Sequence, residues 1–404
     1  MGPARLLFRP HLRSPYRIPS FRAFHASRFN AGLNILFCGS DDFSLRSLQA
    51  LHRLKESGSG IIDSIDVIIK HEKPRGRGLT QQRPNPVKEF AIKNSLELFS
   101  LDEAQFDKWE DPGAVDLIIA VSFGLLIPSR IIEHAKFGGL NVHPSFLPKY
   151  WGAAPIQHAL MNSDSETGVV VQTLHPTKFD AGRILAKSDP LDIKIDYHTH
   201  FPPPPDDPKS PYKILESNLA NVGADLLSSV ITSNLYDPAI QSTLPTITTN
   251  ERRKPARRLK TELSRILFGE VTAEEVFRKS LVFSNLFCYR KLLPRYPGHV
   301  PGPTLRTKMG PFSLPTETEY ESFLKKHSAA VQWVYILEVS RKEGEKGCLA
   351  LQVSPKQWVF VDSFTLEGKK KMHGKEWGHT SPGPVELVSF GPGEDGATQA
   401  TRKE

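Results

Sequence analysis

Short apolar segments alternate with amphipathic ones from Leu33 to about Leu235. A short apolar run bounded by turn residues is typical of a buried strand, whereas apolar residues three or four apart indicate a helix. Strands that alternate with helices predict a parallel sheet covered by helices on both faces. The predicted strands are Ile35–Cys38, Ile65–Ile69, Leu117–Val121 and Val169–Leu174, and the predicted helices are Ser44–Lys55, Val87–Lys93, Ile156–Met161 and Lys213–Thr232.

A Rossmann-like α/β sheet of this kind often binds nucleotides, but the phosphate-binding motifs are absent from the sequence. Gly39 follows the first predicted strand without a G-x-G-x-x-G pattern, and no P-loop occurs. A dinucleotide or a nucleoside triphosphate is therefore not indicated as a ligand.

Two segments bring polar residues to one edge of the predicted sheet. The strand Leu117–Val121 gives way to Ser122-Phe123-Gly124, and two glycines lead into Asn141-Val142-His143. Ligands of open α/β sheets bind beyond the carboxyl ends of the strands. We therefore expect a functional site where these two segments end.

Asn141 and His143, together with Asp180, suit the transfer of a one-carbon acyl group between two amines. Such a transfer passes through a tetrahedral intermediate with a negative oxygen, which an amide N–H stabilises. An imidazole donates to that oxygen or moves a proton, and a nearby carboxylate sets its tautomer. An isolated N-x-H pattern usually contains a structural histidine, but the position at the sheet edge favours catalysis here.

The segments around these three residues resemble the signature of the folate-dependent formyltransferases, and of the methionyl-tRNA formyltransferases in particular. The resemblance begins at Leu33–Phe43, includes the basic loop Lys73–Gly78 and the following Pro84–Lys88, thins after about residue 190 and returns at Thr365–Met372. Its most specific part consists of Asn141-Val142-His143-Pro144-Ser145-Phe146-Leu147-Pro148, Gly152-Ala153-Ala154-Pro155-Ile156-Gln157, Thr167-Gly168-Val169 and Asp180-Ala181-Gly182.

The resemblance implies that Asn141, His143 and Asp180 are the catalytic residues. It also implies that 10-formyltetrahydrofolate is the formyl donor and that no metal ion is needed. The chain departs from the family at Trp151, where an arginine is usual, and Lys149 is near enough in sequence to replace that cation. The implied folate-binding residues are Phe123, Gly124, Leu125, Ser145, Phe146, Leu147 and Pro148.

The implied reaction moves the formyl group onto the α-amine of methionine carried by initiator tRNA. The product, N-formylmethionyl-tRNA, would serve translation initiation in mitochondria. One alternative is a formyltransferase of the glycinamide ribonucleotide type, which needs neither a second domain nor a basic loop. Another is an RNA-binding relative that has lost the activity, although the intact Asn141, His143 and Asp180 argue against it.

Residues 1–30 have the composition of a mitochondrial transit peptide. They contain six arginines, three serines, no acidic residue and no long apolar core. The alternative is a basic arm that binds nucleic acid directly. Without this segment the chain has 46 basic and 44 acidic residues, so only local patches favour an RNA partner. We expect the protein in the mitochondrial matrix.

The rest of the chain divides into a catalytic domain (33–235), a basic linker (236–262), a second domain (263–390) and a disordered tail (391–404). Four consecutive prolines from Pro202 predict an extended, solvated loop in the catalytic domain. In the second domain, predicted strands at Val331–Val339, Cys348–Val353 and Trp358–Val361 favour a small OB-like β-barrel.

Basic residues of the loop, the linker and the barrel rim are the expected tRNA contacts, because phosphate contacts position a nucleic acid without reading its sequence. The longest apolar run, Leu117–Pro128, is too short to cross a membrane, and the three cysteines are too scattered for a zinc knuckle. We expect a monomer. The expected tRNA contacts are Lys73, Arg75, Arg77, Arg252, Arg253, Lys254, Arg257, Arg258, Lys369 and Lys370.

Overall fold

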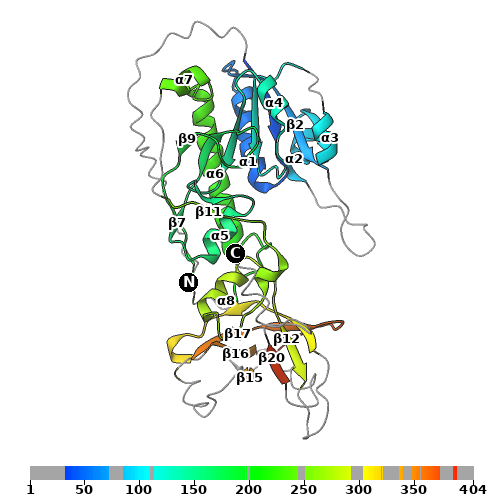
Figure 1. The fold of residues 1–404 in the computed structure, drawn as a ribbon, viewed down its shortest axis with the longest axis vertical. Coiled ribbons are helices and arrows are strands. Elements are labelled where there is room, and N and C mark those ends of the chain that lie inside the picture. The colour runs from blue at the N-terminus through cyan, green and yellow to red at the C-terminus, as the bar shows by residue number, and fades with distance from the viewer. Residues whose placement is uncertain are drawn as a thin grey trace, which may run out of the picture.

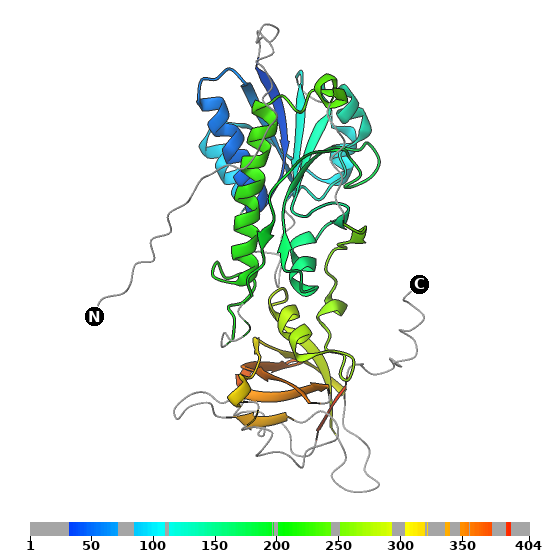
Figure 2. The ribbon, with the colours of Figure 1, turned by 90° about the vertical axis from the view of Figure 1, so that its left-hand side faces the viewer.

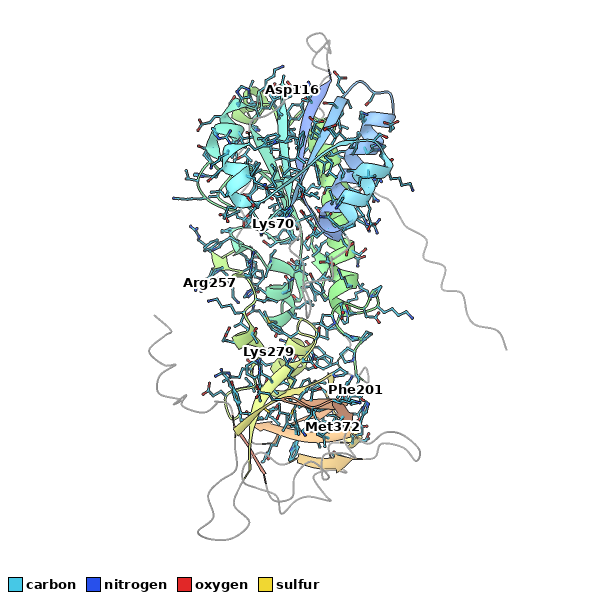
Figure 3. All side chains as sticks on the ribbon, turned by 90° about the vertical axis from the view of Figure 1, so that its right-hand side faces the viewer. Lys70, Asp116, Phe201, Arg257, Lys279 and Met372 are labelled. Carbon is cyan, nitrogen blue, oxygen red and sulfur yellow. The ribbon has the colours of Figure 1, made fainter. Side chains whose placement is uncertain are left out.

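An α/β domain and a smaller antiparallel β region lie at opposite ends of an elongated molecule in the computed structural model (Figure 1). Strand Ile62–Lys70 (β2) ends at Lys70, on the side of the α/β domain that faces the β region, whereas Asp116, which precedes strand Leu117–Val121 (β4), lies at the far end (Figure 3). The carboxyl ends of these strands therefore face the second domain. The structure describes residues 32–71, 85–109, 113–195, 197, 201–243, 251–292, 304–319, 321, 336–339, 348–354, 356–373 and 385–388.

The α/β domain is built on a seven-stranded sheet with the order β3-β2-β1-β4-β5-β8-β9. The first five strands in this order run parallel, but β8 and β9 are antiparallel to their neighbours, so the expectation of a purely parallel sheet was wrong. The short β8–β9 connection cannot make a parallel crossover, which needs a dozen or more residues. The strands not yet bounded are β1 (Leu33–Cys38), β3 (Glu97–Leu101), β5 (Gly139–His143), β8 (Val170–Thr173) and β9 (Ile184–Lys187).

Helices cover both faces of the sheet, as the alternating pattern predicted. One apolar cluster joins Ile35 and Phe37 of β1 to helices α1, α2 and α6, and a second joins Leu36 and Cys38 to α3 and α4. Side chains along β1 alternate between these clusters because successive strand residues point to opposite faces. The helices are α1 (Asp42–Glu56), α2 (Pro86–Lys93), α3 (Glu103–Lys108), α4 (Ser129–His134), α5 (Pro155–Met161) and α6 (Pro211–Thr232), the longest helix in Figure 2.

The proline run before α6 packs in part against the domain. Pro202 and Pro205 are buried, and Ser210 donates from Oγ to the Pro205 carbonyl at 3.1 Å. The same hydroxyl accepts from the Lys213 backbone N–H and so caps α6. The predicted solvated loop is therefore correct only in part, because Pro204, Asp206 and Pro208 are exposed whereas Pro202 and Pro205 pack on the domain.

The basic linker is partly docked on the α/β domain. Helix α7 (Pro238–Thr243) begins it, and strand β11 (Lys254–Pro255) pairs in parallel with β6 (Lys149–Trp151). The Ala256 backbone N–H donates to the Trp151 carbonyl at 2.7 Å, and the Ala154 N–H donates to the Ala256 carbonyl at 3.1 Å. The linker thus contributes to the edge of the domain that carries the polar residues.

The second domain contains a five-stranded and a four-stranded antiparallel sheet, of orders β19-β18-β13-β12-β20 and β14-β17-β16-β15. One core lies between them, and only a few residues separate β13 from β14 and β17 from β18, which lie in different sheets. The closed OB-like barrel stays a prediction. The strands are β12 (Leu286–Leu292), β13 (Thr304–Met309), β14 (Phe312–Ser313), β15 (Ile336–Val339), β16 (Cys348–Ser354), β17 (Gln357–Val361), β18 (Ser363–Leu366), β19 (Lys371–His373) and β20 (Val385–Val388).

Helix α8 (Ala273–Ser280) connects the two domains. It packs on β14 and β17 of the second domain and on α5 of the first. Its Arg278, which is buried, donates from Nε to the hydroxyl of Tyr197 at 2.8 Å. This hydrogen bond joins α8 to the first domain.

Candidate active site

A pocket of about 470 Å³ lies at the carboxyl edge of the sheet, where sequence reasoning placed the site. Its walls come from the segments that follow β1, β4 and β5, from the loop after β8, and from α6. Asn141 and His143 both face it, because residues two apart on a strand share a face. Asp180 reaches the same point from the loop after β8.

The Asp180 carboxylate is the centre of the hydrogen-bond network. Its Oδ1 accepts from Asn141 Nδ2 and from Gln172 Nε2, both at 3.1 Å, and lies 3.3 Å from His143 Nδ1. Its Oδ2 accepts from the Gly152 backbone N–H at 2.7 Å. These four contacts hold the carboxylate in one orientation.

The Asp180-Ala181-Gly182 segment has this sequence for steric reasons. Asp180 adopts a left-handed backbone with φ of 51°, which aspartate tolerates better than most residues. A Cβ on Gly182 would lie 1.7 Å from the Thr173 carbonyl oxygen of β8. Only glycine lets the loop approach the strand closely enough to bring Asp180 to Asn141 and His143.

His143 has an acceptor at each ring nitrogen. Nε2 lies 2.9 Å from the Tyr150 carbonyl oxygen, and Nδ1 faces the Asp180 carboxylate. A neutral imidazole can donate to only one of these oxygens at a time. The Tyr150 contact also means that neither nitrogen is open toward the pocket in this arrangement.

The predicted folate-binding residues divide into two groups. Phe123, Gly124 and Leu125 line the pocket, next to Leu126 and Ile127. In contrast, Ser145, Phe146, Leu147 and Pro148 are not among its lining residues. The Ser145 hydroxyl donates to the Lys149 carbonyl at 2.7 Å, and Phe146 and Leu147 pack with Val170 in a separate apolar cluster.

Comparison with known proteins assigns the chain to a family. The Formyl transferase family model matches residues 33–199. A mitochondrial methionyl-tRNA formyltransferase of Saccharomyces cerevisiae is 35% identical over 291 residues, which cover 64% of this chain and 70% of that protein. The human mitochondrial methionyl-tRNA formyltransferase is 31% identical, with 62% of this chain and 57% of that protein covered.

The chain belongs to the methionyl-tRNA formyltransferase family. It is therefore an enzyme of the formyl-transferring class. Bacterial members match over a shorter region: the Dictyoglomus thermophilum protein is 34% identical, with 49% of this chain and 58% of that protein covered. The chain spans between 57% and 70% of the length of these three relatives. The structure of an N-formyltransferase from Helicobacter canadensis matches this chain at 15% identity with a TM-score of 0.47. The match covers 81% of this chain and 98% of that protein's chain. The family assignment therefore rests on the sequence relatives.

The departure at Trp151 from the methionyl-tRNA formyltransferase pattern is not offset by Lys149. The Lys149 ammonium pairs with Asp164 at 3.0 Å and with Glu251 at 3.6 Å, and Lys149 does not line the pocket. Partial desolvation lowers the pKa of Lys149, but the two carboxylates outweigh this effect and raise the pKa. Trp151 itself lies under the Arg253 guanidinium, 5.1 Å from the ring centre.

The basic residues expected to contact tRNA lie in three places. Lys73, Arg75 and Arg77 fall outside the described residues. Arg252, Arg253, Lys254, Arg257 and Arg258 are exposed along the docked linker, and Figure 3 shows Arg257 between the two domains. Arg258 also lines the pocket. Lys369 and Lys370 are exposed in the turn between β18 and β19.

Sequence reasoning missed several residues of the pocket wall. The Tyr212 hydroxyl donates to Glu216 at 2.6 Å and accepts from Gln157 Nε2 at 3.0 Å, and all three line the pocket. Burial raises the pKa of Tyr212, and the neighbouring Glu216 raises it further. Desolvation likewise raises the pKa of Asp41, against the hydrogen bonds from Ser44. No sequence motif marks Tyr212 and Glu216, which α6 brings to the pocket only in the folded chain, whereas Gln157 and Asp41 lie in segments of the family signature that assign them no role.

The described part of the chain lacks the features of two other classes of site. It contains no group of three or more His, Cys, Asp and Glu side chains that could hold a metal ion. Nor does any helix there combine the length and apolar character that a membrane crossing requires.

Proposed function

We propose that this protein transfers the formyl group of 10-formyltetrahydrofolate to the α-amine of initiator methionyl-tRNA. The observation that carries the proposal is the convergence of Asn141, His143 and Asp180 in one pocket of a methionyl-tRNA formyltransferase family member. The product would be N-formylmethionyl-tRNA. The yeast and human relatives are mitochondrial proteins, which supports an action in mitochondrial translation initiation, in the matrix.

The reaction begins with the α-amine, whose typical pKa of about 7.7 to 8.0 leaves part of it neutral at the working pH. The amine nitrogen forms a bond to the formyl carbon, and the formyl oxygen becomes negative. The bond between that carbon and the folate nitrogen then breaks. The proton that leaves the amine ends on the departing folate nitrogen.

Asn141 stabilises the negative oxygen in this scheme. Its Nδ2 carries two N–H groups, of which one donates to Asp180, so the other remains for the substrate. His143 can donate from Nε2 to the same oxygen only after leaving the Tyr150 carbonyl. A fixed amide donor of this kind contributes roughly a hundredfold to a thousandfold in rate.

Asp180 accepts the amine proton, directly or through a water molecule, and orients His143. Its four contacts hold the carboxylate in place, so little reorganisation is needed when the amine arrives. Proton transfer by a positioned group typically contributes a hundredfold to about ten-thousandfold in rate.

The pocket suits a flat donor with a polar edge. Leu125, Ile127 and Ile132 contribute apolar lining, and Gln172 and Asp180 supply polar atoms. A volume of about 470 Å³ lies within the usual range for small-molecule sites. The folate donor is a substrate here, and its pterin needs no phosphate-binding motif.

The exposed cations of the linker and of the second domain support a nucleic-acid acceptor. Arg252, Arg253, Lys254 and Arg257 lie beside the pocket, where they can contact phosphates of the acceptor arm, and Arg258 lies in the pocket wall. The second domain, for which we retain the OB-like assignment, would add Lys369 and Lys370. These contacts would position the tRNA by charge.

The test uses protein that lacks residues 1–30, with methionyl-tRNA and 10-formyltetrahydrofolate. We expect formyl transfer by the wild type and a fall of orders of magnitude in His143→Ala that folds normally. A wild type that transfers no formyl group to methionyl-tRNA would overturn the assignment. Glycinamide ribonucleotide, tested in parallel, is the acceptor that the alternative would then predict.

A further inference from the structure

Gln172 is a buried amide in the catalytic pocket to which the family signature assigns no role. It lies on β8, opposite Asn141 in the β5–β8 register, and its side chain is 1% exposed. A register shift in the β8–β9 pairing occurs between Val171 and Gln172. Such irregularities re-aim a side chain next to an active site, and here the amide points at Asp180.

The contacts of Asp180 are unevenly divided between its two oxygens. Oδ1 accepts from Asn141 and Gln172 and also faces His143, whereas Oδ2 accepts from the Gly152 N–H alone among the described residues. A carboxylate oxygen has about two lone-pair sites. Oδ1 is therefore saturated, and one acceptor site of Oδ2 stays open.

The other end of the Gln172 amide has no partner. Its buried Oε1 accepts no hydrogen bond from any residue that the structure describes. Buried polar atoms in folded proteins are usually paired. The neighbouring Val170 and Val171 are apolar and fully buried, so packing alone does not require an amide at this position. The contact from Nε2 to Asp180 is what distinguishes glutamine from an apolar residue here.

We propose that Gln172 is a positioning residue that saturates Oδ1 of Asp180, so that Oδ2 accepts the proton of the attacking amine. A donor to a carboxylate stabilises its charged form. Gln172 thereby decides which oxygen of Asp180 receives the proton. This inference rests on the proposed formyl transfer and goes beyond it.

The variant Gln172→Met has a similar volume and no donor. We expect kcat to fall about tenfold, with KM for both substrates nearly unchanged, because one hydrogen bond to a charged group is lost. The acid limb of the kcat profile should move to higher pH, because a donor to the charged carboxylate is lost. A merely structural role would change stability or KM without moving this limb.

Gln352→Met is the matched control. Gln352 lies on β16 of the second domain and also has a buried Oε1 that accepts no hydrogen bond from the described residues. The same substitution there should leave the pH profile unchanged. If Gln172→Met keeps the wild-type profile, or loses activity without a shift of the acid limb, the inference is overturned.

A second variant covers the case in which Gln172→Met does not fold. Gln172→Glu keeps the shape and can donate to Asp180 only when it is protonated. Its activity relative to wild type should rise as the pH falls from about 8 to about 6, because two carboxylates then share a proton. A pH-independent ratio would overturn the inference.

Failure of the proposed function can be told apart from failure of this inference. A wild type that transfers no formyl group would contradict only the proposed function. The Asp180 carboxyl would then be titrated directly by ¹³C NMR in the wild type and in the Gln172 variant that folds. Identical titration curves would contradict the inference about Gln172.

Discussion

Asp180 shows at the scale of one residue how the site depends on backbone geometry. Its left-handed conformation carries a cost, which persists only where the surrounding contacts determine it. The contacts from Asn141, Gln172 and Gly152 do so here. The carboxylate is therefore held in place before any substrate binds.

Replacing Asp180 by asparagine tests the charge without removing the shape. Asparagine tolerates the left-handed backbone, so the fold should survive. We expect kcat to fall by a factor of about 100 to 10,000, because the proton acceptor is lost. Steady-state formyl transfer is the measurement, and Asp189→Asn, an exposed residue after β9, is the control. Activity within a few-fold of wild type would exclude Asp180 as the proton acceptor.

Gly182 gives a steric prediction. An alanine Cβ there meets the Thr173 carbonyl oxygen at 1.7 Å, and a strand carbonyl cannot move aside. We expect Gly182→Ala to lower the free energy of unfolding by about 1 to 3 kcal/mol and to displace Asp180. Thermal unfolding and formyl transfer measure both effects. The control is Gly113→Ala, whose Cβ meets nothing within 4 Å among the described residues, and equal stability of the two variants would refute the prediction.

The β6–β11 pair is the element that connects catalysis to the linker. Gly152 follows β6, donates to Asp180, and has a φ of 114° that leaves a Cβ only 2.9 Å from the Ala256 carbonyl. Arg253, which directly precedes β11, stacks on Trp151. The linker is thus both a cationic surface and a support for the active-site backbone.

These two functions of the linker can be separated by substitution. Arg252 and Arg257 have exposed side chains, and the backbone hydrogen bonds that dock the linker do not need them. The double variant Arg252→Gln/Arg257→Gln should raise KM for tRNA and leave kcat unchanged. The slope of log KM against log salt concentration should fall by roughly one unit for each lost phosphate contact. Lys93→Gln, an exposed cation on α2, is the control. An unaltered salt dependence would show that these arginines do not contact the acceptor.

For the whole molecule, the relative position of the two domains depends on α8. Tyr197 of the first domain accepts from the buried Arg278 and contacts Phe277, with ring centres 5.6 Å apart. Burial raises the pKa of Tyr197, against the effect of Arg278. This interface joins the second domain to the domain that carries the pocket.

Tyr197→Phe removes the acceptor of Arg278 Nε and keeps the ring contact. A buried donor without its partner costs about 1 to 3 kcal/mol, so the domains should separate more easily. We expect KM for tRNA to increase while KM for the folate donor stays constant. Tyr236→Phe, a buried hydroxyl bonded to Asn234 within the first domain, is the control. A parallel change in both KM values would point to a general loss of stability instead.

The sequence alone determined the main elements of the α/β domain and the candidate catalytic residues. Apolar periodicity located β1, β2, β4 and β8 and helices α1, α2, α5 and α6, because burial of one face depends only on local spacing. Asn141, His143 and Asp180 were found because acyl transfer restricts the residue types that can serve it. Short elements such as α3 and β9 carry too few residues for a periodic signal.

Only the tertiary structure decided the direction of β8 and β9, the docking of the linker and the full pocket wall. Strand direction depends on which chain segments meet, and no residue pattern within β8 encodes it. Gln172 and Glu216 reach the pocket from elements distant in sequence, and Lys149 pairs with Asp164 instead of replacing the missing arginine. Such contacts arise from packing between elements, where spacing along the chain carries no information.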